Sequence, residues 1–238
     1  MLEAVNLAKS FGGHVALDRL NLAIPPGETF CLLGANGAGK TTTVNLFLGF
    51  IAPDSGRALV DGIEVAADPI AARRQLLHLP EQVVLYGELS GFENLRYFAA
   101  RAGVEEMEAS RLRACLDEAG LHRDAADRRA STYSKGMRQK VGVAFAIAKR
   151  ATALLLVEPT SGLDPVASTE FYDLVARRRD AGCAVLMVTH DLLRAREVGN
   201  RIGLMRDGRL LHTIAAADIT VEELKRLYLD EMGRRAAA

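Results

Sequence analysis

The sequence of 238 residues predicts an α/β fold built on a largely parallel sheet. Short apolar runs, bounded by glycine and proline, alternate with segments of helical spacing, as strands do with the helices that connect them. From about Phe92 to Arg150 this alternation stops, and helix-forming Ala, Leu, Glu and Arg dominate. We therefore expect a helical subdomain inserted into the sheet. The hydrophobic fraction of 49% is high enough for a substantial core.

The composition excludes several classes of protein. Lys and Arg number 30 and Asp and Glu number 30, so no basic excess favours nucleic acid, and we expect no nucleic-acid partner. The cysteines are too far apart for a disulfide scaffold or a metal site, and they suit a reducing compartment; they are Cys31, Cys115 and Cys183. Met1 to Phe30 show no basic region followed by an apolar stretch, so we expect no secretory signal, and no apolar run reaches the ~18–20 residues of a membrane span. These features predict a cytoplasmic protein.

The first elements are strands and one unit of strand, glycine loop and helix. Leu2–Leu7 and Leu20–Ile24 have the pattern of strands. After a Pro-Pro-Gly turn, the apolar run Thr29–Leu33 predicts a strand buried on both faces. Lys40–Leu48 has helical spacing, and strand-and-turn residues follow over Ile51–Asp68. The clearest unit is therefore the one around residues 29–48.

The second half predicts the helical insertion and then a return to the sheet. Helical spacing recurs over Phe92–Ala102, Met107–Ala119 and Lys135–Lys149. The short apolar runs Ala153–Val157 and Ala184–Thr189 predict strands, with a helix over Pro165–Arg179 between them. Asp207-Gly208 marks a hairpin. An amphipathic helix over Val221–Met232 precedes a terminal segment, 234–238, that we expect to fray.

Residues 34–41, Gly-Ala-Asn-Gly-Ala-Gly-Lys-Thr, match the phosphate-binding pattern G-x-x-x-x-G-K-[ST] in full. Glycines let the backbone curl so that N–H groups point at phosphate oxygens, and the following helix adds its positive end. Lys40 supplies a charge for the β- and γ-phosphates, and the Thr41 hydroxyl is placed for Mg²⁺. The pattern predicts binding of ATP or GTP. The candidate nucleotide-binding residues here are Gly34, Asn36, Gly37, Ala38, Gly39, Lys40, Thr41 and Thr42.

Three later segments occur in a fixed order. Residues 133–139, Tyr-Ser-Lys-Gly-Met-Arg-Gln, open a helix; residues 156–164, Leu-Val-Glu-Pro-Thr-Ser-Gly-Leu-Asp, follow a strand; and His190-Asp191 ends another strand. The chain carries no Asn-Lys-x-Asp for guanine selection. Together with the phosphate loop, these segments resemble the ATP-binding subunits of ABC transporters over about Leu2 to Ile214.

The resemblance implies a P-loop NTPase fold: a RecA-like core with a mixed sheet, an antiparallel β subdomain and an inserted helical subdomain. The expected domains are residues 1–86 with 151–214 as the ATP-binding core, residues 87–150 as the helical signature subdomain, and residues 215–238 as a short C-terminal helix and tail.

Ser134 and Gly136 match the signature motif of the family, usually Leu-Ser-Gly-Gly-Gln. Ser134 is also a good N-cap for the helix that it opens. In the family this element binds the γ-phosphate held by a second ATP-binding subunit, so the resemblance implies a homodimer or a heterodimer. Lys135 replaces a glycine of the motif. It either adds positive charge at that phosphate or is a solvated surface lysine.

The resemblance also implies roles for single residues. Glu158 occupies the position of the catalytic base, and His190 matches the histidine that contacts the γ-phosphate; with Lys40 they form the expected catalytic set. Asp164 ends the segment that contacts the partner's nucleotide. Phe11 matches the aromatic residue that stacks on adenine, although its position also suits an aromatic residue at the edge of the core.

Two departures from the family pattern affect the Mg²⁺ site. Val157 stands where the family has the aspartate that orients Mg²⁺, which indicates an impaired site, an introduced substitution, or rescue by Glu158 or Asp164. In the loop that couples ATP to the membrane subunit, spacing favours Glu81 over its neighbour Gln82 at the position usually held by glutamine. With Thr41, these two residues are the candidate metal ligands.

Residues 83–86, Val-Val-Leu-Tyr, place apolar side chains in a loop, and we expect Val84 and Tyr86 to be partly exposed for a partner. The resemblance implies a transmembrane permease as that partner, and an ATP-hydrolysing subunit held on the inner face of the cell membrane. The transporter is expected to be an exporter, because too few residues remain after the core for a regulatory domain. The alternatives are a hydrolysis-impaired, nucleotide-gated partner subunit, favoured by Val157, and a soluble ABC ATPase of translation or DNA repair.

Overall fold

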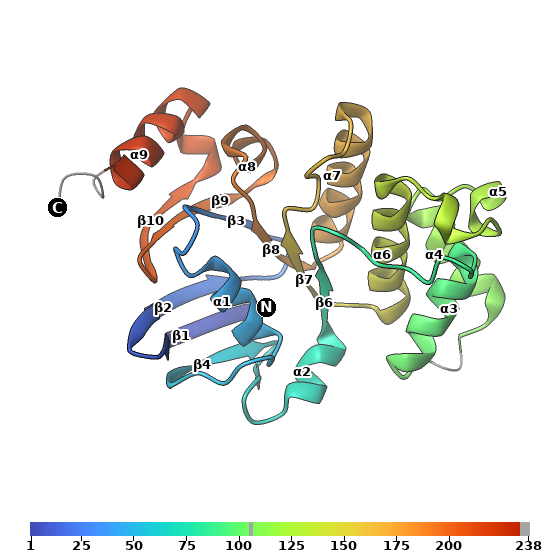
Figure 1. Cartoon of the computed structure of the whole chain (residues 1–238), viewed down its shortest axis with the longest axis horizontal. Helices are drawn as coiled ribbons and strands as arrows, with labels where there is room; N and C mark the ends of the chain where they lie inside the picture. Colours follow the sequence, from blue (N-terminus) through green and yellow to red (C-terminus); the bar gives the residue numbers. More distant parts are fainter. Residues whose placement is uncertain (105–106, 234–238) are drawn as a thin grey trace. The chain divides into compact units, whose positions relative to one another are not determined.

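A computed structural model describes residues 1–104 and 107–233, which form an α/β fold with two β-sheets (Figure 1). The expected fraying at 234–238 lies outside the described residues. Contacts divide the chain into two compact units. Unit 1 comprises Met1–His78, Thr152–Glu158 and Arg179–Ala238, and unit 2 comprises Leu79–Ala151 and Pro159–Arg178. Each unit is described by itself.

The larger sheet has six strands in the order β10-β9-β3-β8-β7-β6. Its strands are β3 (Thr29–Gly34), β6 (Leu76–Leu79), β7 (Ala153–Val157), β8 (Ala184–Val188), β9 (Arg201–Arg206) and β10 (Arg209–Ala215). β3 pairs in parallel with β8 and β9, and β7 pairs in parallel with β8. β10 runs antiparallel to β9 after the turn at Asp207-Gly208. The predicted mixed sheet and hairpin are therefore confirmed.

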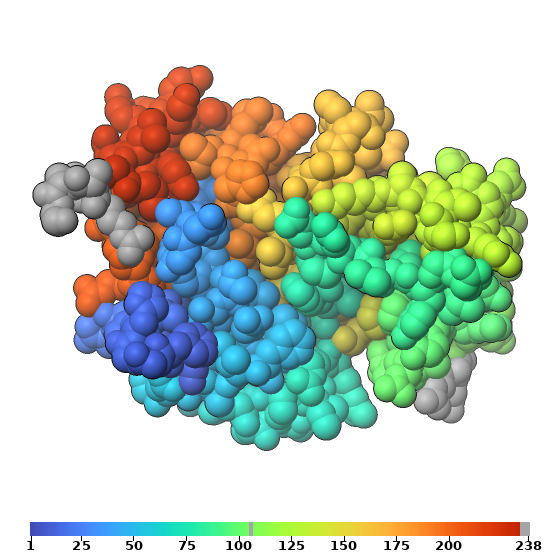
Figure 2. Space-filling model, viewed as in Figure 1, coloured from blue at the N-terminus to red at the C-terminus, as the bar shows by residue number. Residues whose placement is uncertain are grey.

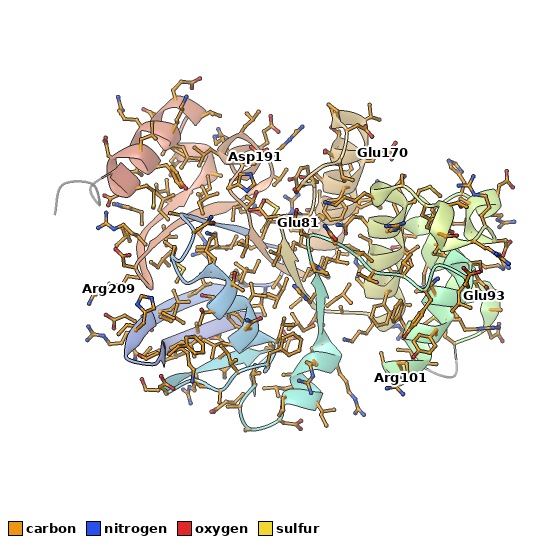
Figure 3. The ribbon with its side chains drawn as sticks, viewed as in Figure 1. Glu81, Glu93, Arg101, Glu170, Asp191 and Arg209 are labelled. Atoms are coloured by element: carbon orange, nitrogen blue, oxygen red, sulfur yellow. The ribbon has the colours of Figure 1, made fainter. Side chains whose placement is uncertain are left out.

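The second sheet is antiparallel, with the order β2-β1-β4-β5. Its strands are β1 (Leu2–Phe11), β2 (His14–Ile24), β4 (Ser55–Val60) and β5 (Ile63–Glu64). β1 and β2 are longer than the sequence pattern predicts, because they continue to a tight hairpin at Gly12 and Gly13, both at positive φ. Figure 2 shows β10, in orange, beside the blue hairpin of β1 and β2. Arg209 of β10, labelled in Figure 3, donates from Nε to the carboxylate of Asp18 in β2 at 2.8 Å.

Unit 1 also holds helices that follow its strands. They are α1 (Lys40–Phe47), α2 (Pro69–Gln75), α8 (Leu192–Val198), α9 (Val221–Gly233) and the 3₁₀ turn η2 (Ala216–Asp218). The sequence pattern does not predict α2 and α8, because seven residues make fewer than two full turns and give a weak helical pattern. Each begins at an aspartate cap: Asp68 accepts from the Ala71 N–H at 2.9 Å, and Asp191 (Figure 3) accepts from the Arg194 N–H at 3.0 Å.

Unit 2 is helical. Its helices are α3 (Gly91–Arg101), α4 (Ala109–Glu118), α5 (Arg123–Ala126), α6 (Lys135–Lys149), the 3₁₀ turn η1 (Ala130–Thr132) and most of α7 (Pro165–Asp180). Ser90 and Glu93 form a reciprocal capping box at the start of α3. The hydroxyl of Tyr133 is buried among these helices, where it donates to the Ala125 carbonyl at 2.5 Å and accepts from the Gly91 N–H at 3.1 Å.

The units differ in extent from the expected domains: residues 79–86, expected in the core, group with unit 2, and the expected C-terminal segment from residue 215 groups with unit 1. Pro159–Arg178 also groups with the helices and not with the sheet. Contacts of α7 explain this. Glu170, labelled in Figure 3, pairs with Lys140 of α6 at 2.7 Å, and Arg178 pairs with Glu118 of α4 at 3.8 Å. Of the helices in residues 1–104 and 107–233, none combines the length and apolar character required to span a membrane.

Candidate functional site

The phosphate loop of unit 1 connects β3 to α1, as the sequence predicts. Gly37 and Gly39 have φ values of 81° and 105°, a region that other L residues rarely adopt. A Cβ atom on Gly39 would lie 2.5 Å from the Ala16 carbonyl oxygen, and one on Gly34 would lie 2.3 Å from that of Met205. Backbone conformation and space therefore both require glycine, which explains why these residues occur at this spacing.

We expect Gly39→Ala to lower the free energy of unfolding by about 2 kcal/mol more than Gly37→Ala does. Both variants strain a positive φ, but a Cβ at Gly37 meets no atom within 4 Å, whereas one at Gly39 overlaps a backbone carbonyl. Urea denaturation of the two purified variants measures the difference. Equal losses of unfolding free energy in the two variants would show that the structure relieves the overlap between the new Cβ and the Ala16 carbonyl oxygen at no cost.

Lys40 is held against the loop that it follows. Its Nζ donates to the carbonyls of Gly34 at 2.6 Å and Ala35 at 2.9 Å. Burial lowers the pKa of the ammonium below its ordinary value, and the nearby Glu158 carboxylate opposes this shift. A cation that has already lost part of its hydration, at the start of a helix, is well placed to attract a phosphate.

The remaining residues of the loop divide by exposure. Asn36 and Thr41 are exposed, Thr42 is half-buried and Ala38 is buried. The Ala38 carbonyl accepts from the Gly208 N–H of the β9–β10 turn at 3.0 Å. The Thr41 hydroxyl is therefore accessible in the first turn of α1, while the loop behind it is fixed by the hairpin.

Glu158 and His190, two residues of the expected catalytic set, lie together in unit 1. Glu158 follows β7 with φ 44°, in the left-handed region. Its Oε1 is 2.8 Å from Nδ1 of His190, whose ring is largely exposed. His190 is placed to donate to an ionised carboxylate at this position, because such a carboxylate only accepts hydrogen bonds.

Thr189 is a member of this cluster that the sequence analysis missed. Its hydroxyl accepts from the Asp191 N–H at 3.1 Å and donates to Oε2 of Glu158 at 3.1 Å. The side chain is buried, so its single proton is committed to the carboxylate. The available indication was a hydroxyl residue at the end of a strand, next to His190.

Phe11 ends β1 and is 48% exposed, so it does not pack in the core. The ammonium of Lys9 lies 5.5 Å from the centroid of its ring. An aromatic face this accessible is available for stacking.

In unit 2, two of the predicted site residues cap helices. Ser134 is the residue before α6 and accepts from the Met137 N–H at 3.2 Å, which confirms the predicted N-cap. Asp164 precedes α7 and accepts from the Ala167 N–H at 2.9 Å. A Cβ on Gly136 would lie 3.5 Å from that of Ala167, so the two helix starts pack closely.

Lys135 is not the solvated surface lysine that was one of the two alternatives for it; the other alternative, positive charge at the partner's phosphate, stays a prediction. It is half-buried, and its Nζ donates to the carbonyl of Ser161 in its own unit. The hydroxyl of the same serine donates to Oε1 of Glu81 at 2.9 Å. Gln82 is exposed and lines a cavity of about 390 Å³ together with Val83, Val84, Leu85, Gly87, Ala130, Ser131, Lys135 and Arg138.

Val157 offers no ligand to a metal ion. It is half-buried, packs against the core and pairs with Val188 in the sheet. Within the described ranges, no group of three or more His, Cys, Asp or Glu could hold a metal. Since Mg²⁺ in nucleotide sites keeps several waters and phosphate oxygens, the Thr41 hydroxyl fits an ion held mainly by the nucleotide.

Comparisons with known proteins agree with this geometry. A family model described as "ABC transporter" matches residues 17–161. The chain is 35% identical, over its whole length and 73% of the relative's, to the daunorubicin/doxorubicin resistance ATP-binding protein of Streptomyces peucetius. A structure described as the ATP-binding subunit of an ABC transporter is 30% identical, covers both chains fully and superposes with a TM-score of 0.83.

A second solved structure, the bacterial ABC transporter cassette MJ0796 in its dimeric form, is 27% identical and superposes with a TM-score of 0.79, covering 91% of this chain and 99% of its own. The phosphate loop, the paired Glu158 and His190, and these similarities lead to one assignment. The chain belongs to the ABC transporter family, as an ATP-binding, ATP-hydrolysing subunit.

Proposed function

We propose that this ATPase powers an exporter through a separate membrane permease. The similarity to a subunit named for resistance to daunorubicin and doxorubicin carries this proposal, because a transporter that moved such a compound out of the cell would give resistance to it. The ATPase would then act at the cytoplasmic face of the membrane, held there by the permease.

The residues of unit 1 would bind ATP and catalyse its hydrolysis. Phosphate oxygens would lie against the loop amides of residues 34–39 and the Lys40 ammonium. Phe11 would stack on adenine. Glu158 would polarise the attacking water, and His190, held by the carboxylate at 2.8 Å, would contact the γ-phosphate. Mg²⁺ would be held by the Thr41 hydroxyl and the nucleotide. Its positive charge would stabilise the negative charge of the phosphoryl group that is transferred.

The residues of unit 2 would contact other subunits. In a dimer, Ser134 and Gly136 would face the nucleotide of a second ATP-binding subunit, and Asp164 would border that site. Glu81 and Gln82 would couple the nucleotide site to the permease. The dimeric state of MJ0796 supports this arrangement.

Exposed apolar residues support a permease contact. Val84 is 82% exposed and Tyr86 is 52% exposed, which confirms the prediction made for them. Both lie in the loop beside the 390 Å³ cavity of unit 2. A short amphipathic segment of the permease would cover them.

The proposal is tested by co-expressing the chain with a candidate membrane permease, chosen from the genes next to its own. We expect the two to co-purify, and we expect ATP-driven accumulation of a lipophilic cationic drug in inside-out vesicles. Val84→Glu should abolish co-purification and drug accumulation without changing ATP binding, because it places a charge on the exposed apolar loop. Val166→Glu is the matched control, because Val166 is 69% exposed on α7. Equal effects of the two substitutions, or no co-purification, would refute the proposal.

Thr189→Val should lower kcat for ATP hydrolysis about tenfold and leave KM within about twofold. The valine removes the hydroxyl that donates to Glu158, and a hydrogen bond to a charged group contributes about 1.5–3 kcal/mol. Thr189→Ser keeps the hydroxyl and should retain most of the activity. A serine variant as impaired as the valine variant would assign the loss to packing.

A further inference from the structure

The 159–164 loop, residues Pro159 to Asp164, is held by the lysine that replaces a glycine of the signature motif. Lys135, the first residue of α6, donates from Nζ to the Ser161 carbonyl. A Cβ on Gly162, which has φ 69°, would lie 3.8 Å from the same Nζ. The ammonium therefore lies against the backbone of the loop, within unit 2.

Two further residues hold the same loop. The Ser161 hydroxyl donates to the carboxylate of Glu81 at 2.9 Å. Gln139, one turn after Lys135 and fully buried, donates from Nε2 to the Pro159 carbonyl at 3.1 Å and to the Glu81 carbonyl at 3.5 Å. Lys135 thus binds the carbonyl of Ser161, and Glu81 binds its hydroxyl. Helix α6 contacts the loop at two successive turns, through Lys135 and Gln139.

The position of this loop in the chain gives the contacts a consequence. It begins at the residue directly after Glu158 and ends at Asp164, the cap of α7. A glycine at position 135, as in the usual motif, has no side chain to reach Ser161. The lysine therefore adds a charged hydrogen bond that a glycine at this position cannot make.

We propose that Lys135 is a positioning residue that fixes the 159–164 loop of its own chain. It acts on kcat through the loop and does not bind the γ-phosphate of a partner subunit. The effect on kcat rests on the proposed roles of Glu158 and Asp164 in hydrolysis, whereas the effect on the loop does not.

Hydrogen exchange of the full chain without nucleotide tests the loop contact directly. The Leu163 N–H donates to the Thr160 carbonyl at 3.0 Å, so its exchange rate reports on opening of the loop. Lys135→Met should speed exchange in peptides covering residues 160–164 about tenfold, because the lost bond is charged. Lys135→Arg keeps a cationic donor and should stay within about threefold of the parent rate.

Two further variants test whether faster exchange is specific to the loss of the Lys135 side chain. Lys149→Met removes a lysine from the other end of α6 and should leave exchange in residues 160–164 unchanged. Lys135→Gly restores the usual residue of the motif and should speed exchange as the methionine does. If circular dichroism shows that the Lys135→Met protein is unfolded, the Lys135→Gly protein is used in its place.

Steady-state ATP hydrolysis completes the test. Lys135→Met should lower kcat about fivefold with KM within about twofold, and Lys135→Arg should restore kcat. A raised KM with unchanged exchange would indicate a contact with the partner's phosphate and would overturn the proposal. Unchanged exchange with unchanged kinetics, or faster exchange with unchanged kcat, would also overturn it. If the parent chain does not hydrolyse ATP, the exchange result alone decides whether Lys135 holds the loop.

Discussion

Glu158→Gln is expected to lower kcat for ATP hydrolysis about 100- to 1,000-fold while ATP affinity stays within about threefold. The amide has the size of the carboxylate and can still accept from the Thr189 hydroxyl, so the local structure is retained. It cannot take a proton from water, and general-base catalysis contributes about 10²–10⁴ in rate. Single-turnover hydrolysis and a fluorescent ATP-analogue titration measure the two quantities separately.

Glu197→Gln is the matched control for this substitution. Glu197 lies in α8 of the same unit, pairs with Arg194 at 2.7 Å and is half-exposed. It should hydrolyse ATP at the parent rate. A Glu158→Gln protein that retained more than a tenth of the parent kcat would remove Glu158 from the role of base.

The second large effect is expected from Val157→Asp, which should raise Mg²⁺-dependent hydrolysis at least tenfold. The aspartate would supply the carboxylate that the resemblance to the family implies for orienting Mg²⁺, and charge stabilisation by a metal contributes several kcal/mol to such reactions. Each 1.36 kcal/mol corresponds to a tenfold change in rate. The Mg²⁺ concentration that gives half-maximal hydrolysis should fall in parallel.

Val157→Asn separates charge from shape, because it has the size of aspartate without its charge, and it should stay near the parent rate. Both polar residues replace a valine that packs on the core, so both should lower the melting temperature. Equal hydrolysis by the parent and the aspartate variant would refute the idea that Val157 limits turnover. A very low parent rate that the aspartate restores would favour the alternative of a nucleotide-gated partner subunit.

The sequence predicted the fold well where the pattern is long or chemically specific. Strand β7 and helix α6 have the predicted bounds, and the phosphate loop lies between the predicted strand and helix. The loop was predictable because its glycines meet backbone constraints that no other residue satisfies. Glu158 and His190 were each predicted as site residues, but their contact was not; it arises because they follow β7 and β8, which are neighbouring parallel strands.

Contacts that depend on distant segments were not predictable. The partner of Lys135 is Ser161, 26 positions away along the chain, and nothing in the spacing of either residue indicates the pair. The same holds for the grouping of Pro159–Arg178 with the helices, since it depends on ion pairs made by α7. The helices α2 and α8 were missed because short elements depend more on capping and tertiary packing than on periodicity.

The β9–β10 turn sets the order in which the site can form. Gly208 donates to the Ala38 carbonyl and accepts from the Asp18 N–H at 2.9 Å, so this turn joins the phosphate loop to β2. The loop is synthesised about 170 residues before the turn that supports it, and contacts so far apart in sequence form late. During translation, a nascent chain that ends before Arg206 should therefore fail to retain ATP, and affinity should be acquired only when the last strands have left the ribosome.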